Sequence, residues 1–196
     1  MIRPEALRRV IMRPAGASSD FDLNPGVASA VRLLRPAAVL VAVCNRPCGA
    51  EVILTKRSSR LAHHPGQIAF PGGKIEAEDT GPEAAALREA REEIGLDPGL
   101  VQLLGCLPAH ETVTGFRVTP VLGLITDDFI ARPEPGEVDE VFAVPLAHLA
   151  DPAHYRIEAR LWRGQWRRYY AVPFGPYYIW GATARILRGL AEGLQQ

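Results

Sequence analysis

The sequence has few cysteines, no long apolar run and no excess of positive charge. Its 196 residues include three cysteines, an odd number and too few for a disulfide framework, so we expect reduced thiols. No apolar run is long enough for a membrane span or a signal peptide, so we expect a cytoplasmic protein with no membrane partner. Basic and acidic residues number 22 each, so no excess of positive charge indicates a nucleic-acid partner.

The composition is that of a globular protein that can bury a core, with 47% hydrophobic and 22% charged residues. We expect one domain over residues 31–196, preceded by a partly helical N-terminal extension over residues 1–30. Within this extension, Asp20-Phe21-Asp22 lies among Ser, Pro and Gly residues, a pattern that predicts an exposed turn.

Apolar runs and turn residues predict an α+β fold with a mixed sheet between helices. The runs 37–44 and 51–57 predict a hairpin, and a helix follows within the stretch 70–96. Further strands are expected at 101–107, within 110–125 and within 131–149, the last leading into a short helix. A second hairpin is expected within 154–174, and an amphipathic helix within 177–194.

The second hairpin is rich in aromatic and basic residues, which are Trp162, Trp166, Arg167, Arg168, Tyr169 and Tyr170. Aromatic rings beside arginines can stack on nucleic-acid bases. Because no wider basic stripe accompanies them, we favour a hairpin that packs on the core or forms the contact of a homodimer.

The stretch 70–96, FPGGKIEAEDTGPEAAALREAREEIGL, carries the clearest chemical pattern in the chain. It predicts a glycine-rich turn at 71–73 and then a helix that ends at Gly95. Glu89, Glu92 and Glu93 stand at i, i+3 and i+4 and therefore share one face of this helix. The opposite side offers apolar residues for core packing, namely Ala86, Leu87, Ala90 and Ile94.

Three carboxylates at this spacing repel one another unless a cation lies among them. Their hard oxygen atoms suit Mg²⁺ or Mn²⁺, ions that commonly sit between a few carboxylates and a substrate phosphate. A solvated helix face with Glu–Arg pairs is the alternative interpretation.

The long loop before this helix, residues 58–73, holds candidate partners for phosphate and ribose groups. Arg57 and Arg60 offer guanidinium groups, while His64 and Gln67 offer hydrogen bonds. The neighbours His63 and His64 could instead ligate a transition metal, but adjacent residues of an extended segment point to opposite sides.

The stretch around the helix resembles the Nudix box, G-x5-E-x7-R-E-U-x-E-E-x-G-U, in which U is an aliphatic residue. The matching residues are Gly73, Arg88, Glu89, Ala90, Glu92, Glu93, Gly95 and Leu96. Two departures are visible: Asp79 stands where the first Glu is expected, and eight residues separate it from Arg88 in place of seven.

The preceding loop resembles the motif that accompanies the box in coenzyme A pyrophosphatases, L-L-T-x-R-S-x3-R-x3-G-x3-F-P-G-G. The matching residues are Leu54, Thr55, Arg57, Ser58, Gly66, Phe70, Pro71, Gly72 and Gly73. Ile53 replaces the first Leu, and Ala62 stands where the second Arg is expected, with Arg60 two residues earlier. Together the two motifs cover residues 53–96.

The resemblance implies an α/β/α sandwich and a metal-dependent hydrolase that cleaves the diphosphate of coenzyme A or an acyl derivative to 3′,5′-ADP and a 4′-phosphopantetheine fragment. Hydrolysis of ADP-ribose, dinucleotides or nucleoside triphosphates is a second possibility, and a nucleotide-binding module without catalysis is a third. Each of these functions has a small nucleotide-diphosphate ligand as its partner.

The expected site follows from the same motifs. Glu89, Glu92 and Glu93 are candidate ligands of Mg²⁺ or Mn²⁺, and a water would lose its proton to Glu92, Glu93 or Glu137. Arg88 is expected to orient a glutamate through an ion pair.

Other residues are expected to meet the substrate. Arg57 would bind a substrate phosphate, and Gly72 and Gly73 would let the backbone approach metal or phosphate closely. Glu140 is a second candidate for an added carboxylate. Phe116 is a candidate substrate contact, although the alternation of its strand favours a core residue.

Overall fold

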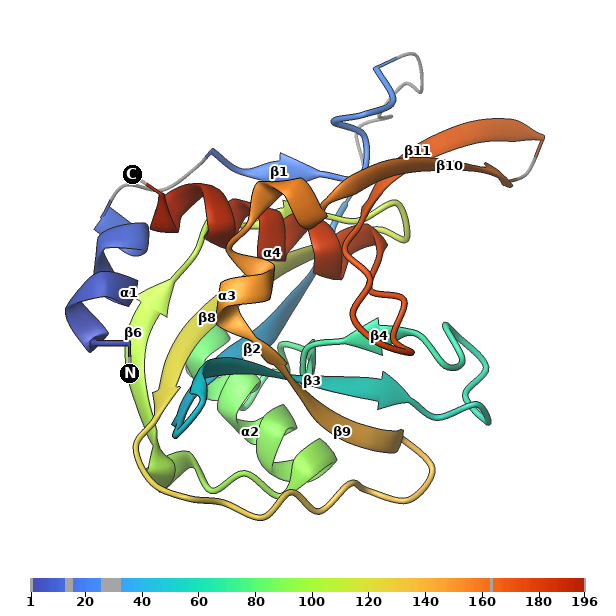
Figure 1. Cartoon of the computed structure of the whole chain (residues 1–196). Coiled ribbons are helices and arrows are strands. Elements are labelled where there is room, and N and C mark those ends of the chain that lie inside the picture. The colour runs from blue at the N-terminus through green and yellow to red at the C-terminus, as the bar shows by residue number, and fades with distance from the viewer. Residues whose placement is uncertain (1, 13–15, 26–32, 163, 196) are drawn as a thin grey trace.

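The protein, for which we describe a computed structural model, has two helical layers with a sheet between them (Figure 1). The structure describes residues 2–12, 16–25, 33–162 and 164–195. Its helices are α1 (Pro4–Met12), α2 (Pro82–Ile94), α3 (Leu146–Leu149) and α4 (Gly181–Leu194), with 3₁₀ helices η1 (Pro98–Leu100) and η2 (Pro152–His154). No helix in these ranges combines the length and apolarity that a bilayer span requires.

Nine strands in the described part of the chain form one mixed sheet. They are β1 (Ser18–Ser19), β2 (Arg35–Arg46), β3 (Gly49–Arg57), β4 (Ile68–Ala69), β5 (Gly72–Lys74), β6 (Val101–Cys106), β7 (His110–Glu111), β8 (Phe116–Ile125) and β9 (Val138–Pro145). The strand order is β1-β7-β8-β2-β3-β4, while β5 pairs with β2, β6 with β8, and β9 with β3. The α+β prediction and the first hairpin, formed by antiparallel β2 and β3, are confirmed.

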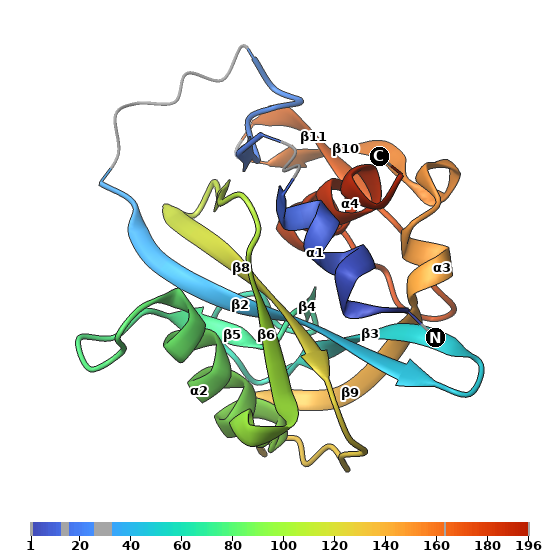
Figure 2. The same ribbon diagram turned by 90° about the vertical axis from the view of Figure 1, so that its left-hand side faces the viewer.

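The centre of the sheet is buried on both faces, which explains the continuous apolar runs of its strands. Strand β2 pairs in parallel with β8 from Arg35 to Cys44. Val41 of β2 belongs to the core on the α4 side and Leu40 to the core on the α2 side, and both are fully buried. Figure 2 shows the two helical layers on opposite sides of these strands.

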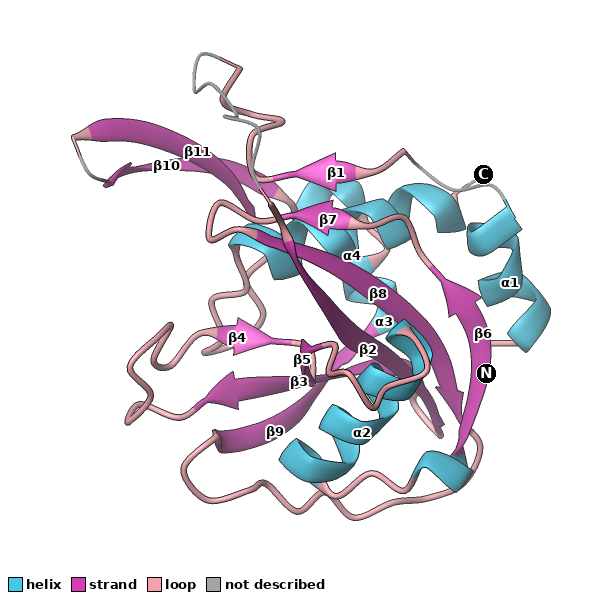
Figure 3. Ribbon diagram, turned by 180° about the vertical axis from the view of Figure 1, so that it is seen from behind, coloured by secondary structure: helices cyan, strands magenta, loops and turns pink. Residues whose placement is uncertain are grey.

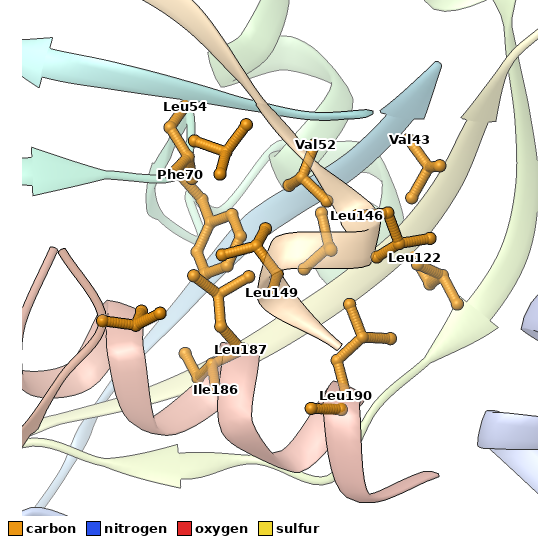
Figure 4. Close-up of a cluster of buried hydrophobic side chains, with 14 of the residues drawn as sticks. Val43, Val52, Leu54, Phe70, Leu122, Leu146, Leu149, Ile186, Leu187 and Leu190 are labelled. Carbon is orange, nitrogen blue, oxygen red and sulfur yellow. The ribbon is translucent and has the colours of Figure 1, made fainter. Parts of the chain in front are cut away.

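The two cores differ in the size of their side chains. On the α4 side, large residues interlock (Figure 4): Leu54 and Leu122 come from the sheet, Phe70 from the segment between β4 and β5, Leu149 from α3 and Leu187 from α4. On the α2 side, the helix contributes mainly alanines, which are Ala85, Ala86 and Ala90, followed by Ile94. These small residues let α2 lie close to the sheet, and this closeness brings its glutamates to β5.

The expected glycine turn at 71–73 is wrong. Gly72 and Gly73 are part of strand β5, which pairs antiparallel with Ala37–Val39 of β2. The loop before it also contains the short strand β4, which pairs with the end of β3. Local turn chemistry predicted a bend here, but pairing with a strand more than 30 residues away prevails.

The N-terminal extension packs against the domain. Helix α1 is confirmed, and it buries Leu7 and Val10 against α4 and the sheet. The expected exposed turn at 20–22 is a turn, but it is partly buried and Asp20 is hydrogen-bonded with the buried His110. The expected boundary between residues 30 and 31 lies outside the described residues.

The second hairpin forms a separate two-stranded ribbon of β10 (Arg156–Trp162) and β11 (Gln165–Ala171) that projects from the body (Figure 1). Its base packs through Tyr170, but towards the tip Trp166 is 69% exposed and Leu161 58%. Core packing, the first of the two expected roles of this hairpin, therefore holds for its base and not for its tip. A homodimer contact through this ribbon stays a prediction.

A pair of glycines in α4 tests how α1 docks. We expect Gly193→Ala to lower the free energy of unfolding by about 1–2 kcal/mol. The reason is that its Cβ would lie 2.4 Å from Cγ1 of the buried Val10. Urea denaturation followed by circular dichroism measures the loss.

Gly189→Ala, in the same helix, is the matched control. The nearest atom to its Cβ would be Nη1 of Arg185 at 3.9 Å. Stability should stay unchanged or rise by about 0.5–1 kcal/mol, because alanine favours a helix over glycine. If both variants were equally stable, the close contact between α1 and α4 would be refuted.

Candidate active site

Helix α2 presents its three glutamates at different depths. Glu93 is only 5% exposed, and Glu89 is partly buried. The side chain of Glu92 is 56% exposed. The expected single acidic face therefore runs from the sheet out to solvent, beside strand β5 (Figure 3).

The buried carboxylate of Glu93 has two partners in other elements. The backbone N–H of Gly72 donates a hydrogen bond to its Oε2 at 3.0 Å. The guanidinium of Arg57, at the end of β3, lies 3.9 Å from its Oε1. Burial raises the pKa of Glu93 to about 7, and the Gly72 N–H and the Arg57 charge oppose this rise only in part.

Strand β5 lies so close to α2 at Gly73 and to β2 at Gly72 that an added side chain would collide at both positions. A Cβ on Gly73 would lie 2.4 Å from Oε1 of Glu89, and one on Gly72 would lie 2.4 Å from the carbonyl oxygen of Ala38. The φ of +154° at Gly72 also disfavours any other residue. The two glycines therefore let the backbone of β5 lie close to β2 and to the carboxylates of α2. The expected approach of this backbone to metal or phosphate stays a prediction.

Arg88 makes five hydrogen bonds, one for each of its N–H donors. Nε and Nη2 bind Asp79 at 3.1 and 2.9 Å, and Nη2 also binds the carbonyl of Lys74 at 3.1 Å. Nη1 binds both Glu89 and Glu92 at 3.1 Å. No donor is left for a ligand, so the geometry favours the expected orienting role.

Asp79, which stands where the first acid of the box is expected, is a main partner of Arg88 despite the extra residue between them. Its hydrogen bonds with Arg88 hold the pKa of Asp79 below its usual range. The same contact, more than any other, raises the pKa of Arg88. The position of Asp79 in the sequence pattern was the only signal for this role.

Glu137 and Glu140, the two candidate acids of the segment 131–149, lie in different surroundings. The charge of Glu137 raises the pKa of both Glu89 and Glu93, so Glu137 lies near this carboxylate cluster. Glu140 accepts a hydrogen bond from the Tyr177 hydroxyl at 2.5 Å, and it shares its side of β9 with Phe142 of the α4-side core. The expectation that Glu140 faces the metal site is wrong, because alternate residues of a strand point to opposite faces.

The remaining predicted residues stand apart from the carboxylates. Arg60 and His64 are exposed in the loop before β4, and His64 adopts a positive φ of 56°. Gln67 lies in the same loop, where its backbone carbonyl accepts the N–H of Arg57 at 3.0 Å. Phe116, the first residue of β8, stacks under the guanidinium of Arg35, which lies 4.0 Å from the ring centroid.

The carboxylates fit a divalent cation. Burial raises the pKa of Glu89 as it does that of Glu93, so negative charge here is poorly compensated by the protein. Within the described ranges, no three acidic, imidazole or thiol side chains converge into a finished metal cage. Mg²⁺ commonly binds through one or two carboxylates together with substrate phosphates, and this donor set suits such binding.

We expect Glu93→Gln to stabilise the metal-free protein at pH 8 by about 2–3 kcal/mol. The folded-state pKa of Glu93, about 7, lies above its ordinary value of 4.5. Folding therefore favours the protonated carboxyl, and this contribution is lost as pH rises from 4.5 through 7. Glutamine does not ionise, so the difference between variant and wild type should vanish near pH 4.

Urea denaturation with a chelator present measures this effect. Glu83→Gln is the matched control, since Glu83 is an exposed glutamate in the first turn of the same helix. Equal stability of wild type and Glu93→Gln at pH 8 would show that burial does not raise the pKa of Glu93.

Comparisons with known proteins agree with this geometry. A model of the NUDIX domain matches residues 34–163. NudL of Escherichia coli O6:H1, an uncharacterized Nudix hydrolase, is 43% identical over 157 residues, which cover 80% of this chain and 81% of NudL. NudL of Salmonella heidelberg is 41% identical over 169 residues, which cover 86% and 88%.

A solved structure shares the fold. The Nudix hydrolase RenU from M. smegmatis superposes with a TM-score of 0.51 and 27% identity, over 60% of this chain and 74% of RenU. The chain therefore belongs to the Nudix hydrolases, enzymes that act on pyrophosphate bonds and generally use divalent metal cations.

Proposed function

We propose that this Nudix hydrolase cleaves the diphosphate of coenzyme A or an acyl-coenzyme A, giving 3′,5′-ADP and 4′-phosphopantetheine or its acyl form. The observation that carries the proposal is the contact between Arg57 and Glu93, 3.9 Å apart. It joins the loop motif that resembles coenzyme A pyrophosphatases to the helix of the Nudix box.

The proposed chemistry begins with charge. A diphosphate resists attack because its anionic oxygens repel a nucleophile. Arg57 would bind a substrate phosphate with its guanidinium, which is partly exposed beside Glu93. The backbone of Gly72 and Gly73 would leave room for the substrate, since neither residue carries a side chain.

The proposed cation is Mg²⁺ or Mn²⁺, held by Glu89, Glu92 and Glu93. When bound, it would neutralise phosphate oxygens and make a coordinated water more acidic. Arg88 would hold Glu89 and Glu92 in position through its 3.1 Å hydrogen bonds.

Two carboxylates are candidates for the base that takes the proton of the attacking water. Glu93 has a pKa of about 7, which suits proton transfer at neutral pH. Glu137 is exposed near the cluster, and its position leaves it free to reach a water at the substrate. Glu92, the third candidate of the sequence pattern, points towards Arg88 and solvent.

The alternative functions have less support from the sequence motifs. Hydrolysis of ADP-ribose, dinucleotides or nucleoside triphosphates would use the same carboxylates, and a binding module without turnover would keep the fold. The small-molecule ligand, the absence of nucleic-acid and membrane partners, a homodimer and a cytoplasmic location stay predictions that accompany the proposal.

Product analysis tests the substrate. Incubation of the full chain with coenzyme A and Mg²⁺ or Mn²⁺ should release 3′,5′-ADP and 4′-phosphopantetheine, separated by chromatography. A panel containing ADP-ribose, a dinucleotide and a nucleoside triphosphate should react more slowly. Turnover of ADP-ribose with none of coenzyme A would reject the proposal, and binding without any turnover would favour the non-catalytic module.

The carboxylate roles are tested by substitution. Glu93→Gln should lower kcat by about 100-fold or more with the fold intact, because a charge that acts on the transition state is lost. Glu83→Gln, in the same helix, should leave kcat unchanged. A wild-type rate for Glu93→Gln would refute the role.

Comparison with Glu137→Gln then identifies the base. The variant that removes the base should also remove the acidic limb of the pH profile of kcat. Glu134→Gln is the control for Glu137, since Glu134 is exposed in the same loop. If both glutamine variants kept that limb, neither residue would be the base.

A further inference from the structure

Ser58 follows Arg57 in the loop motif, and the proposed chemistry gives it no part. It is fully buried, although the next two residues along the chain are exposed. Its Oγ accepts the N–H of Arg60 at 3.3 Å, and its carbonyl accepts the N–H of Leu61 at 3.2 Å. These bonds close a tight turn directly after Arg57, whose guanidinium lies beside Glu93.

The segment before β9 is bonded both to this turn and to α2. The backbone carbonyl of Glu137 accepts the N–H of Ser58 at 2.8 Å, and the N–H of Glu137 donates to the carbonyl of Glu134 at 3.1 Å. The N–H of Glu134 donates in turn to the carbonyl of Glu93 at 2.9 Å. Glu137 is therefore fixed at both of its backbone groups, although its side chain is exposed.

Asp139 binds the same turn from β9. Its Oδ2 accepts the N–H of Ser59 at 2.9 Å. This bond, and next to it a hydrogen bond with the Ser58 hydroxyl, holds the pKa of Asp139 below its usual range. An ionised carboxylate on β9 therefore accepts hydrogen bonds from both serines of the turn.

Asp139 is also the extra residue of a β-bulge. The register between β3 and β9 skips it, because Lys56 pairs with Glu140 while the next residue, Arg57, pairs with Val138. Figure 3 shows the end of β3 and the start of β9 side by side. A bulge bends its strand and re-aims the side chains beside it, and bulges are common next to active sites. This bulge lies where β3 ends in an arginine of the proposed site.

We propose that Asp139 is a positioning residue for the hydrolysis, because its carboxylate holds the turn at Ser58 and thereby fixes Arg57 and Glu137 relative to Glu93. The inference rests on the proposed function through the roles given there to Arg57 and Glu137. Asp139 acts through its backbone and hydroxyl partners and needs no contact with the substrate. Such alignment matters because a displacement of about 1 Å at a reacting group can lower a rate by about 100-fold.

Kinetics of two substitutions at Asp139 test this role. Asp139→Ala should lower kcat by about tenfold or more and change KM by less than about threefold, because misaligned groups act on the transition state more than on the bound substrate. Asp139→Asn should restore kcat to within about threefold of the wild type, because its side-chain oxygen still accepts the N–H of Ser59. Both constants are measured with the pyrophosphate substrate of the panel that the wild type hydrolyses fastest, and circular dichroism checks the fold.

Asp151→Ala is the matched control. Asp151 is an exposed aspartate in the connection between α3 and the ribbon, and it accepts the N–H of Ala153 at 2.9 Å. Its substitution removes the same kind of hydrogen bond from a different turn and should leave kcat unchanged. Adding Ser58→Ala to Asp139→Ala should lower kcat little further, because both substitutions release the same turn.

Four results would overturn the proposal. Asp139→Ala could keep the wild-type kcat, or Asp151→Ala could be equally slow, which would indicate a general effect of lost stability. Asp139→Asn could be as slow as Asp139→Ala, which would assign Asp139 a role through its charge. The effects of Ser58→Ala and Asp139→Ala could also multiply, which would show that the two residues act separately.

The outcomes separate this inference from the proposed function. The expected loss of kcat in Asp139→Ala on ADP-ribose, with no turnover of coenzyme A by the wild type, would retain the positioning role and reject the substrate. Turnover of coenzyme A by Asp139→Ala at the wild-type kcat would retain the function and reject the positioning role. A wild type that hydrolyses no member of the panel would reject both.

Discussion

The hydrogen bond from Gly72 to the buried carboxylate of Glu93 is the contact on which the site depends. It joins β5 to α2 at an acid whose burial raises its pKa to about 7, and the hydrogen bond itself opposes this rise in part. The contact depends on Gly73 and on the alanines of the inner helix face, because larger residues would separate β5 from α2, and on Gly72, whose Cβ would collide with β2. Fold and chemistry are therefore specified by the same small residues.

The sequence predicted what local patterns determine. Helix α2, the hairpin of β2 and β3 and the helix α1 follow from apolar spacing and turn residues, and the acids of α2 were identified from their own spacing. The burial of Glu93, the strand at Gly72 and the pairing of Asp79 with Arg88 were not predictable in this way. Each depends on contact with another element, whose distance from α2 no local pattern records.

Arg88 and the N-terminal extension show two ways in which the chain adds to the common domain. Arg88 compensates for one extra loop residue, because Asp79 still reaches its guanidinium and fills two of its donors. The N-terminal extension, β11 and α4 lie largely outside the matched range 34–163. The family domain thus supplies the carboxylates, while these flanking elements form the surface beyond them.

The separate ribbon has a consequence for spectroscopy. The three tryptophans of the chain are Trp162, Trp166 and Trp180. The first two belong to the ribbon or its end, and Trp180 forms a β-bridge with Ala171 at its base. Tryptophan fluorescence therefore reports on the ribbon and its base. The helix and strands that hold the carboxylates contain no tryptophan and do not contribute to this signal.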